Sequence, residues 1–154
     1  MLNKTIKVAT GALLISLAAG SIADDSPFEA EIEARKAFMQ VVKFNMGVLG
    51  GMARGKVDYD ATAAETAAKN MHLLTQMNNT AMYPKGSDSK SLPDETTAKP
   101  EIWSSAKIGE IHGQWAKASA TLAETAGKGL PELRANIGAV GKTCKGCHDD
   151  FRTE

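Results

Sequence analysis

The two cysteines of this chain lie close together near its C-terminal end, in the run Cys144-Lys145-Gly146-Cys147-His148. Two thiols three positions apart, followed directly by a histidine, form the pattern of covalent c-type haem attachment. Each thiol adds to one vinyl group of the haem, and the histidine binds the iron. The pattern therefore predicts a covalent haem c, one per chain, with His148 as the metal ligand. A flat cofactor of that size requires a fold that surrounds it.

The same cysteines belong to a stripe of apolar residues with helical spacing. The stripe consists of Leu133, Ile137, Val140, Cys144, Cys147 and Phe151. Steps of three and four place all of them on one face of a helix. A haem attached to this face would lie against the interior of the molecule.

The remaining sequence predicts further helices and no strands, because no stretch alternates apolar and polar residues with a β-branched bias. The expected helices run from Ser26 to about Gly50, from Asp60 to Asn78, from Glu101 to Thr125, and from Pro131 to the C-terminus. A polar, proline-containing connection covers residues 79–100. Four helices joined by short turns, apart from that connection, predict an all-α fold, an antiparallel up-down-up-down four-helix bundle with covalent haem.

Local signals mark the start of the first helix. Ser26 is expected to cap it, Pro27 suits the first helical position, and Glu29 falls where a capping box places its acidic residue.

The N-terminus has the pattern of a secretory signal peptide. Two lysines lie within residues 1–7, an apolar stretch covers residues 8–20, and Ser21-Ile22-Ala23 supplies the small residues of a cleavage site. The apolar stretch is shorter than the roughly 20 residues that span a bilayer. We therefore expect residues 1–23 to be removed and residues 24–154 to form one periplasmic domain with no membrane segment.

The charge balance excludes one class of partner. The chain has 18 basic and 18 acidic residues, and no basic patch of the kind that binds nucleic acid is visible. The sequence also shows no nucleophile–base pair, no phosphate-binding loop and no paired carboxylates, so it does not indicate an enzyme.

Two alternatives to haem use the same cysteines. A dithiol redox pair usually stands at the start of a helix that follows a strand, whereas this pair lies late in a helix. A structural zinc site needs four ligands at suitable spacing, and only His72 and His112 remain, each on a different expected helix. A haem-free dithiol or structural helical protein is the alternative of a different class.

Arg35 lies on the buried stripe of the first expected helix, between Ile32 and Met39. A buried charge is costly unless it is paired. Arg35 either extends its head group to the surface or binds a haem propionate, since arginine can bind a carboxylate through two parallel hydrogen bonds. Arg152 lies one turn beyond His148 and is either next to the iron ligand or a cation favoured by the helix C-terminus.

Met39 is the residue that separates two mechanisms. A thioether bound to iron gives a six-coordinate, low-spin electron carrier, whereas a thioether that only packs over the iron leaves it five-coordinate. An ordinary core methionine is the third interpretation. Trp103, at the expected start of the third helix, packs near the haem edge or caps the core.

The run from Cys144 to Arg152 resembles that of cytochrome c', the class II c-type cytochromes of the bacterial periplasm. Pro100-Glu101-Ile102-Trp103 is similar to the family's entry to its third helix, and the segment from Met82 to Ser87 is similar to the one after the second. The resemblance covers essentially the whole mature chain and implies a left-handed antiparallel bundle.

The resemblance also implies the roles of individual residues. It implies a high-spin haem with His148 as its single protein ligand, Arg35 near the propionates, Arg152 beside the proximal histidine and Met39 on the distal side. Met82 and Trp103 are expected to contact the cofactor.

The implied ligands are nitric oxide and carbon monoxide, and some relatives transfer electrons to a redox partner that the sequence does not identify. A homodimer through the first helices is also implied. Phe44, Val48 and Met52, which flank the first stripe, are the candidate contacts.

Two positions depart from the family's pattern. Lys36 stands where many relatives have glutamine, which alters the surroundings expected for the propionates. Met39 stands where many have leucine and where low-spin relatives carry an axial methionine. Those relatives often lack an arginine at the position of Arg35, so its presence favours the five-coordinate interpretation, with the low-spin electron carrier as the alternative.

Overall fold

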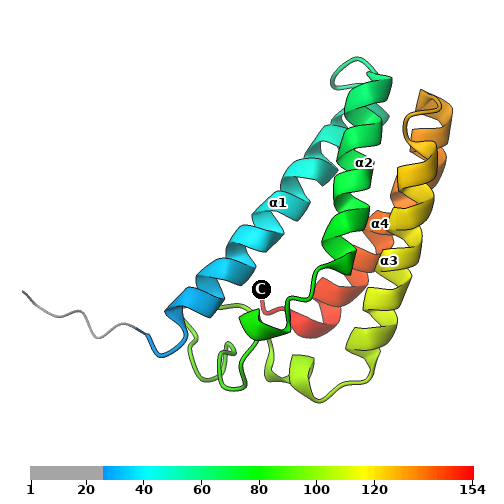
Figure 1. Cartoon of the computed structure of the whole chain (residues 1–154). Coiled ribbons are helices and arrows are strands. Elements are labelled where there is room, and N and C mark those ends of the chain that lie inside the picture. Colours follow the sequence, from blue (N-terminus) through cyan, green and yellow to red (C-terminus); the bar gives the residue numbers. More distant parts are fainter. Residues whose placement is uncertain (1–25) are drawn as a thin grey trace, which may run out of the picture.

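The computed structural model of this chain describes residues 26–154, so the signal peptide expected over residues 1–23 lies outside the described residues. The described part forms four α-helices in up-down-up-down order and no β-sheet (Figure 1). The helices are α1 (Glu29–Ala53), α2 (Ala61–Gln76), α3 (Lys107–Thr125) and α4 (Leu130–Phe151), with two short 3-10 helices, η1 (Thr80–Met82) and η2 (Pro100–Trp103). The predicted all-α bundle is confirmed.

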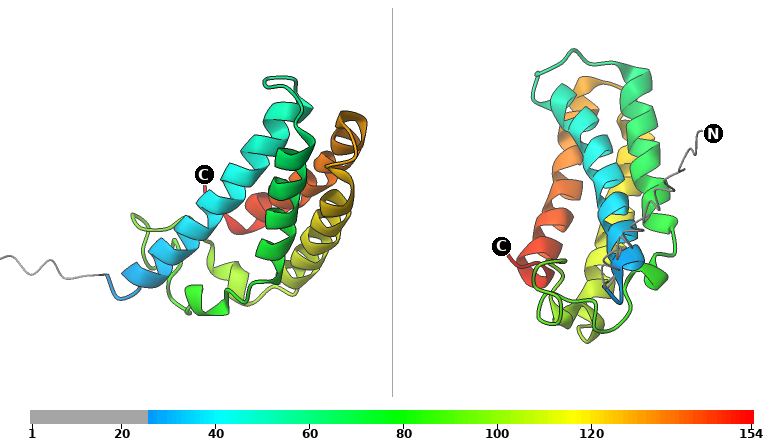
Figure 2. Two further views of the ribbon diagram at one scale, coloured as in Figure 1. Left: turned by 45° about the horizontal axis from the view of Figure 1, so that its top comes forward. Right: turned by 90° about the vertical axis from the view of Figure 1, so that its left-hand side faces the viewer.

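The short turns and the long connection lie at opposite ends of the bundle. The α1–α2 and α3–α4 turns are together at one end, and Gly55 in the first turn has a φ of 68°, which favours glycine. At the other end lie the start of α1, the connection between α2 and α3, and the C-terminal turn of α4 (Figures 1 and 2). We call this second end the loop end. It brings together segments that are far apart in the sequence.

Two of the expected helix starts are wrong. Residues 100–103 form η2 rather than the first turn of α3, because the N–H groups of Ser104 and Ser105 both donate to the carbonyl of Glu101 and close a tight turn there. The α3 helix then starts at Lys107, whose N–H donates to the Ser105 hydroxyl at 3.3 Å.

The start of α1 also differs from the predicted capping box. Phe28 occupies the capping position and its side chain has no group that can cap. Ser26 contributes its backbone carbonyl instead, which accepts from the Glu29 N–H at 3.1 Å. By contrast, Asp60 caps α2 as expected, since its carboxylate accepts from the Ala63 N–H at 2.8 Å.

The core is a continuous apolar cluster contributed by all four α-helices. Its members include Phe38, Val42, Leu49, Met52, Met71, Leu122, Leu133 and Val140. Burial of such side chains contributes about 1.5–3 kcal/mol each relative to exposure. Met52 was expected at the surface and is instead buried, because it projects into this cluster from the last turn of α1.

None of the described helices combines the length and the apolar character needed to cross a membrane.

Candidate haem site

The two cysteines and the histidine lie in the last two turns of α4. Cys144 and Cys147 are free thiols, and both are partly buried. Cys144 packs against the edge of the apolar cluster, while His148, the residue after Cys147, is exposed. The stripe predicted for this helix is therefore confirmed: Leu133, Val140 and Phe151 are buried along the same face.

The surroundings of the thiols do not favour dithiol chemistry. Burial raises the pKa of both Cys144 and Cys147, and the neighbouring Cys144 and Asp150 raise the pKa of Cys147 further. A reactive dithiol needs the opposite, because the thiolate is the nucleophile and redox sites lower its pKa. Within residues 26–154 no three histidine, cysteine or acidic side chains lie close enough to hold a metal ion, so the zinc alternative has no ligand set there.

Arg152 follows α4 directly and is exposed, with its backbone extended. Its N–H donates to the carbonyl of His148 at 3.1 Å. Partial burial of the imidazole lowers the pKa of His148, and the positive charge of Arg152 lowers it further. Both effects favour the neutral ring, which is the form that binds a metal.

The guanidinium of Arg35 is held by the long connection. Only 5% of the residue is exposed. Its Nη1 donates to the Ser87 hydroxyl at 2.7 Å and to the Met82 carbonyl at 3.4 Å. Its Nη2 donates to the Ser87 carbonyl at 2.5 Å and to the Thr96 hydroxyl at 2.6 Å. The prediction that Arg35 is buried is confirmed, and its head group does not extend to the surface.

All of these partners are neutral. No carboxylate lies within ion-pair distance of Arg35 in the part of the chain that the structure describes. Burial lowers the pKa of Arg35, while Tyr83 and Asp88 act in the opposite direction. A buried cation whose hydrogen-bond partners are all neutral attracts a carboxylate group such as a haem propionate.

Met39 and Lys36 lie at the edge of the α1 stripe rather than within it. Met39, one turn after Arg35, has 42% of its surface exposed, and Lys36 is exposed as well. Met39 was expected to project inward from the first helix, and its exposure shows that this expectation is wrong.

Trp103 and Met82 both lie at the loop end, but Trp103 belongs to η2 rather than to α3. The indole N–H of Trp103 donates to the carbonyl of Tyr83 at 2.7 Å. Met82 is half-buried and packs against the apolar cluster. Met82 therefore packs the connection onto the bundle, while Trp103 joins the two ends of the connection to each other.

Tyr83, Ser87 and Thr96 were missed by the sequence reasoning. The Tyr83 ring lies 5.4 Å from the guanidinium carbon of Arg35, measured to the ring centroid, which is cation–π range. Burial raises the pKa of its phenol. An aromatic residue before Pro84 in an otherwise polar connection was the available signal for Tyr83. No feature of the sequence singled out Ser87 or Thr96.

Comparison with known proteins identifies the family. The family model described as Cytochrome C' matches residues 30–152. The chain belongs to the cytochrome c' family. The cytochrome c' of Cereibacter sphaeroides is 37% identical over 96% of this chain and 98% of its own length. A cytochrome c-554 of the same species is 31% identical over 84% of this chain and 97% of its own.

Solved structures of cytochrome c' agree with the fold. The protein from Rhodobacter sphaeroides has a TM-score of 0.80 at 37% identity, covering 84% of this chain and 99% of its own. Another cytochrome c', described for an unusual ligand-controlled dimer dissociation, has a TM-score of 0.73 at 29% identity, covering 82% of this chain and 96% of its own. Cytochrome c' proteins carry haem c, so this chain is a c-type haem protein and the haem-free alternative is set aside.

The residues present fit that cofactor. Two protonated thiols and a neutral imidazole share one end of α4, where the apolar cluster ends at Cys144. A buried cation without a carboxylate in ion-pair distance among the described residues, Arg35, is hydrogen-bonded to the connection that also contacts the end of α4. These groups match the vinyl carbons, the iron and the propionates of a haem.

Proposed function

We propose that this cytochrome c' is a periplasmic haem protein with five-coordinate, high-spin iron. Cys144 and Cys147 hold the haem through thioether bonds, and His148 is the single protein ligand. The haem supplies an iron atom that binds nitric oxide or carbon monoxide and exchanges one electron. The protein supplies the attachment, the proximal ligand and the restriction of access on the opposite side.

The buried guanidinium of Arg35 is the observation that carries this proposal. It is held rigidly by hydrogen bonds to Ser87 and Thr96, and no carboxylate within the described chain neutralises it. The Nη1 and Nη2 donors are all used in hydrogen bonds to neutral acceptors, so a haem propionate would meet the positive charge of the guanidinium rather than a free pair of Nη donors. The sequence resemblance connects an arginine at this position with the high-spin members of the family.

On the proximal side, Arg152 and His148 act together. Lowering the pKa of the imidazole favours the neutral ring and so favours iron binding. On the opposite side, the family resemblance assigns the distal position to Met39 of α1, which is more exposed than a core methionine. A side chain in that position restricts ligand entry without closing it.

The test is an absorption spectrum of ferric and ferrous protein, with and without carbon monoxide. A far-red charge-transfer band in the ferric state and poorly resolved α and β bands are the expected high-spin signature. A sharp α band in the reduced state, with a band typical of iron bound to methionine, would contradict the proposal.

The second candidate function is an electron carrier with Met39 as the sixth ligand, and a low-spin spectrum would indicate it. One observation favours it: Met39 has 42% of its surface exposed, so few contacts hold its thioether in place. A methionine with that freedom is able to turn toward a nearby iron. Its redox partner would accept or donate one electron and is not identified by the chain.

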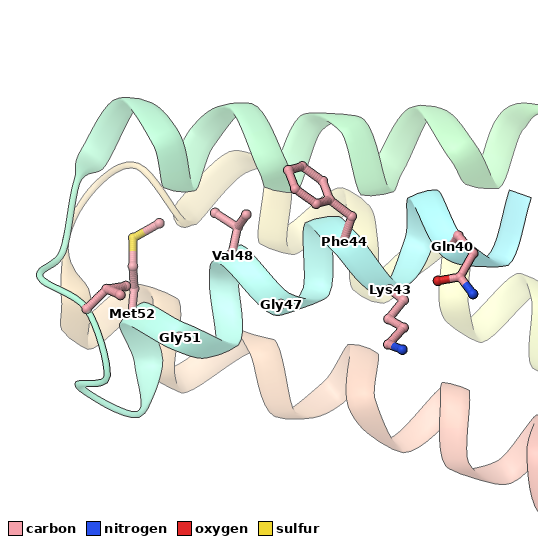
Figure 3. A pocket seen from close by; sticks show the side chains of 8 residues that line it. Gln40, Lys43, Phe44, Gly47, Val48, Gly51 and Met52 are labelled. Atoms are coloured by element: carbon pink, nitrogen blue, oxygen red, sulfur yellow. The ribbon is translucent and has the colours of Figure 1, made fainter. Parts of the chain in front are cut away.

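We further propose that two chains associate through α1. A groove of about 600 Å³ on α1 is lined by Gln40, Lys43, Phe44, Gly47, Val48, Gly51, Met52 and Val57. Figure 3 shows side chains that line it. Phe44 has 70% and Val57 56% of their surfaces exposed, which is unusual for side chains of this type. The relative described for ligand-controlled dimer dissociation supports a dimer, and the exposed apolar residues are the reason for choosing α1 as its interface. Light scattering of the haem-loaded protein, with and without carbon monoxide, measures it.

Export to the periplasm is proposed from the N-terminal sequence alone. Residues 1–23 have the charged, apolar and small-residue zones of a signal peptide. The intact mass of the protein recovered from a periplasmic fraction tests this. A polypeptide that begins at Asp24 supports export, and one that retains Met1 contradicts it.

A further inference from the structure

The connection between α2 and α3 is held at two places, which lie on two different helices, α1 and α4. The first place is Arg35 on α1, whose guanidinium binds Ser87 and Thr96. The second is the end of α4. The carbonyl of Thr97 accepts from the Thr153 N–H at 2.9 Å, and the Lys99 N–H donates to the Phe151 carbonyl at 2.9 Å. We call residues 82–99 the strap.

The strap closes the C-terminus of the helix that carries the proposed iron ligand. The last carbonyls of a helix have no partners within the helix. In α4 the Phe151 carbonyl is satisfied by the Lys99 N–H, and the Asp149 carbonyl accepts from the Lys99 Nζ at 3.3 Å. Residues 98 and 152 form an isolated antiparallel bridge. His148 therefore lies in a turn whose end is fixed by residues of the strap.

Thr96 links the two places. Its hydroxyl accepts from Arg35 Nη2 at 2.6 Å and from the Ala98 N–H at 3.2 Å. Only 8% of Thr96 is exposed. A buried hydroxyl that accepts from a charged donor and from the backbone fixes the direction of the next residues, because an alternative direction would leave both donors unsatisfied.

We propose that Thr96 is a positioning residue for the proximal side of the site, which acts by transmitting the fixed position of Arg35 through the strap to the last turn of α4. The part that concerns the iron rests on the proposed function of His148. The part that concerns the strap rests only on the hydrogen bonds of the chain.

The experiment uses the haem-loaded mature protein and the variant Thr96→Val, which keeps the shape of the side chain and removes the hydroxyl. Hydrogen exchange followed by mass spectrometry reports the amides of Lys99 and Thr153. We expect these to exchange on the order of tenfold faster, which corresponds to about 1.4 kcal/mol. Thr96→Ser restores the hydroxyl and is expected to return exchange to the wild-type rate.

Thr97→Val is the matched control, because the Thr97 side chain is exposed and the strap uses its backbone carbonyl. It is expected to leave exchange at both amides unchanged. Should Thr96→Val fail to fold, Arg35→Lys tests the same link, since it keeps the charge and loses the planar fork. It is also expected to speed exchange at both amides.

The iron–histidine stretching band of the ferrous protein, recorded by resonance Raman spectroscopy, provides the second readout. We expect it to shift or broaden in Thr96→Val and not in Thr97→Val. Wild-type exchange rates in both Thr96→Val and Arg35→Lys would contradict the proposal that Thr96 transmits the position of Arg35 through the strap. Faster exchange with an unchanged band overturns the positioning of His148. A wild-type protein that carries no haem contradicts the proposed function instead, and leaves the exchange test of the strap intact.

Discussion

Replacement of Met39 by alanine separates the two mechanisms most sharply. Met39 has 42% of its surface exposed. Full burial of a methionine contributes about 1.5–3 kcal/mol, so truncation of a half-exposed one costs less than that range and leaves the bundle folded. A change in ligand binding then reflects access to the iron rather than a loss of structure.

The expected change in the carbon monoxide association rate follows from the cost of moving the Met39 side chain aside. If Met39 only packs over the distal side, carbon monoxide reaches the iron when this side chain moves away from its preferred rotamer. Such a displacement costs about 0.5–1.5 kcal/mol. Removing the gate therefore raises the association rate roughly two- to tenfold. The spectrum of the ferric protein stays high-spin.

Flash photolysis of the carbon monoxide complex measures this rate. Met77→Ala is the control, because Met77 has a similar exposed fraction of 40% but follows the end of α2. The control is expected to bind at the wild-type rate. Equal association rates for wild type and Met39→Ala would show that Met39 is not the gate. A low-spin wild-type spectrum that becomes high-spin in the variant would show that Met39 is the sixth ligand.

The remaining predictions concern assembly, alkaline stability and attachment. Phe44→Glu places a charge on the exposed apolar face of α1 and is expected to give a monomer by light scattering, whereas Gln114→Glu on α3 leaves the mass unchanged. A dimeric Phe44→Glu protein would move the interface elsewhere. Burial raises the pKa of Tyr83 above the ordinary value of 10.0, so the folded state favours the neutral phenol. That stability is present below pH 10.0 and is lost as the pH rises through the folded-state pKa. Denaturant unfolding should therefore show a smaller alkaline loss for Tyr83→Phe, and an identical loss in both proteins contradicts this. Cys144→Ser is expected to reduce the yield of mature haem protein in periplasmic extracts, and an unchanged yield argues against a core built around haem.

Periodicity was sufficient to predict the four α-helices and the buried face of α4. Apolar residues at steps of three and four mark a helix face wherever the helix begins, which is why Leu133, Val140 and Phe151 were correctly placed. The predicted start of α3 was wrong because a proline before an acidic residue opens a 3-10 turn as readily as an α-helix. The distinction depends on hydrogen bonds of Ser104 and Ser105 that the sequence pattern does not contain.

The site shows the same division between local and distant information. The burial of Arg35 followed from its place in a stripe on its own helix. Its partners did not, because Ser87 and Thr96 are 52 and 61 residues away in a polar connection with no periodicity. The connection acquires its structure from contacts with α1 and α4, so its role becomes visible only once those helices are packed.

The central claim is that a haem is bonded to both cysteines of α4. Mass spectrometry of the peptide that contains Cys144 and Cys147, taken from protein made in a haem-competent periplasm, tests it directly. We expect one haem on this peptide, retained after extraction with acidified acetone. A peptide with the mass of the bare polypeptide and two thiols open to alkylation would contradict the account.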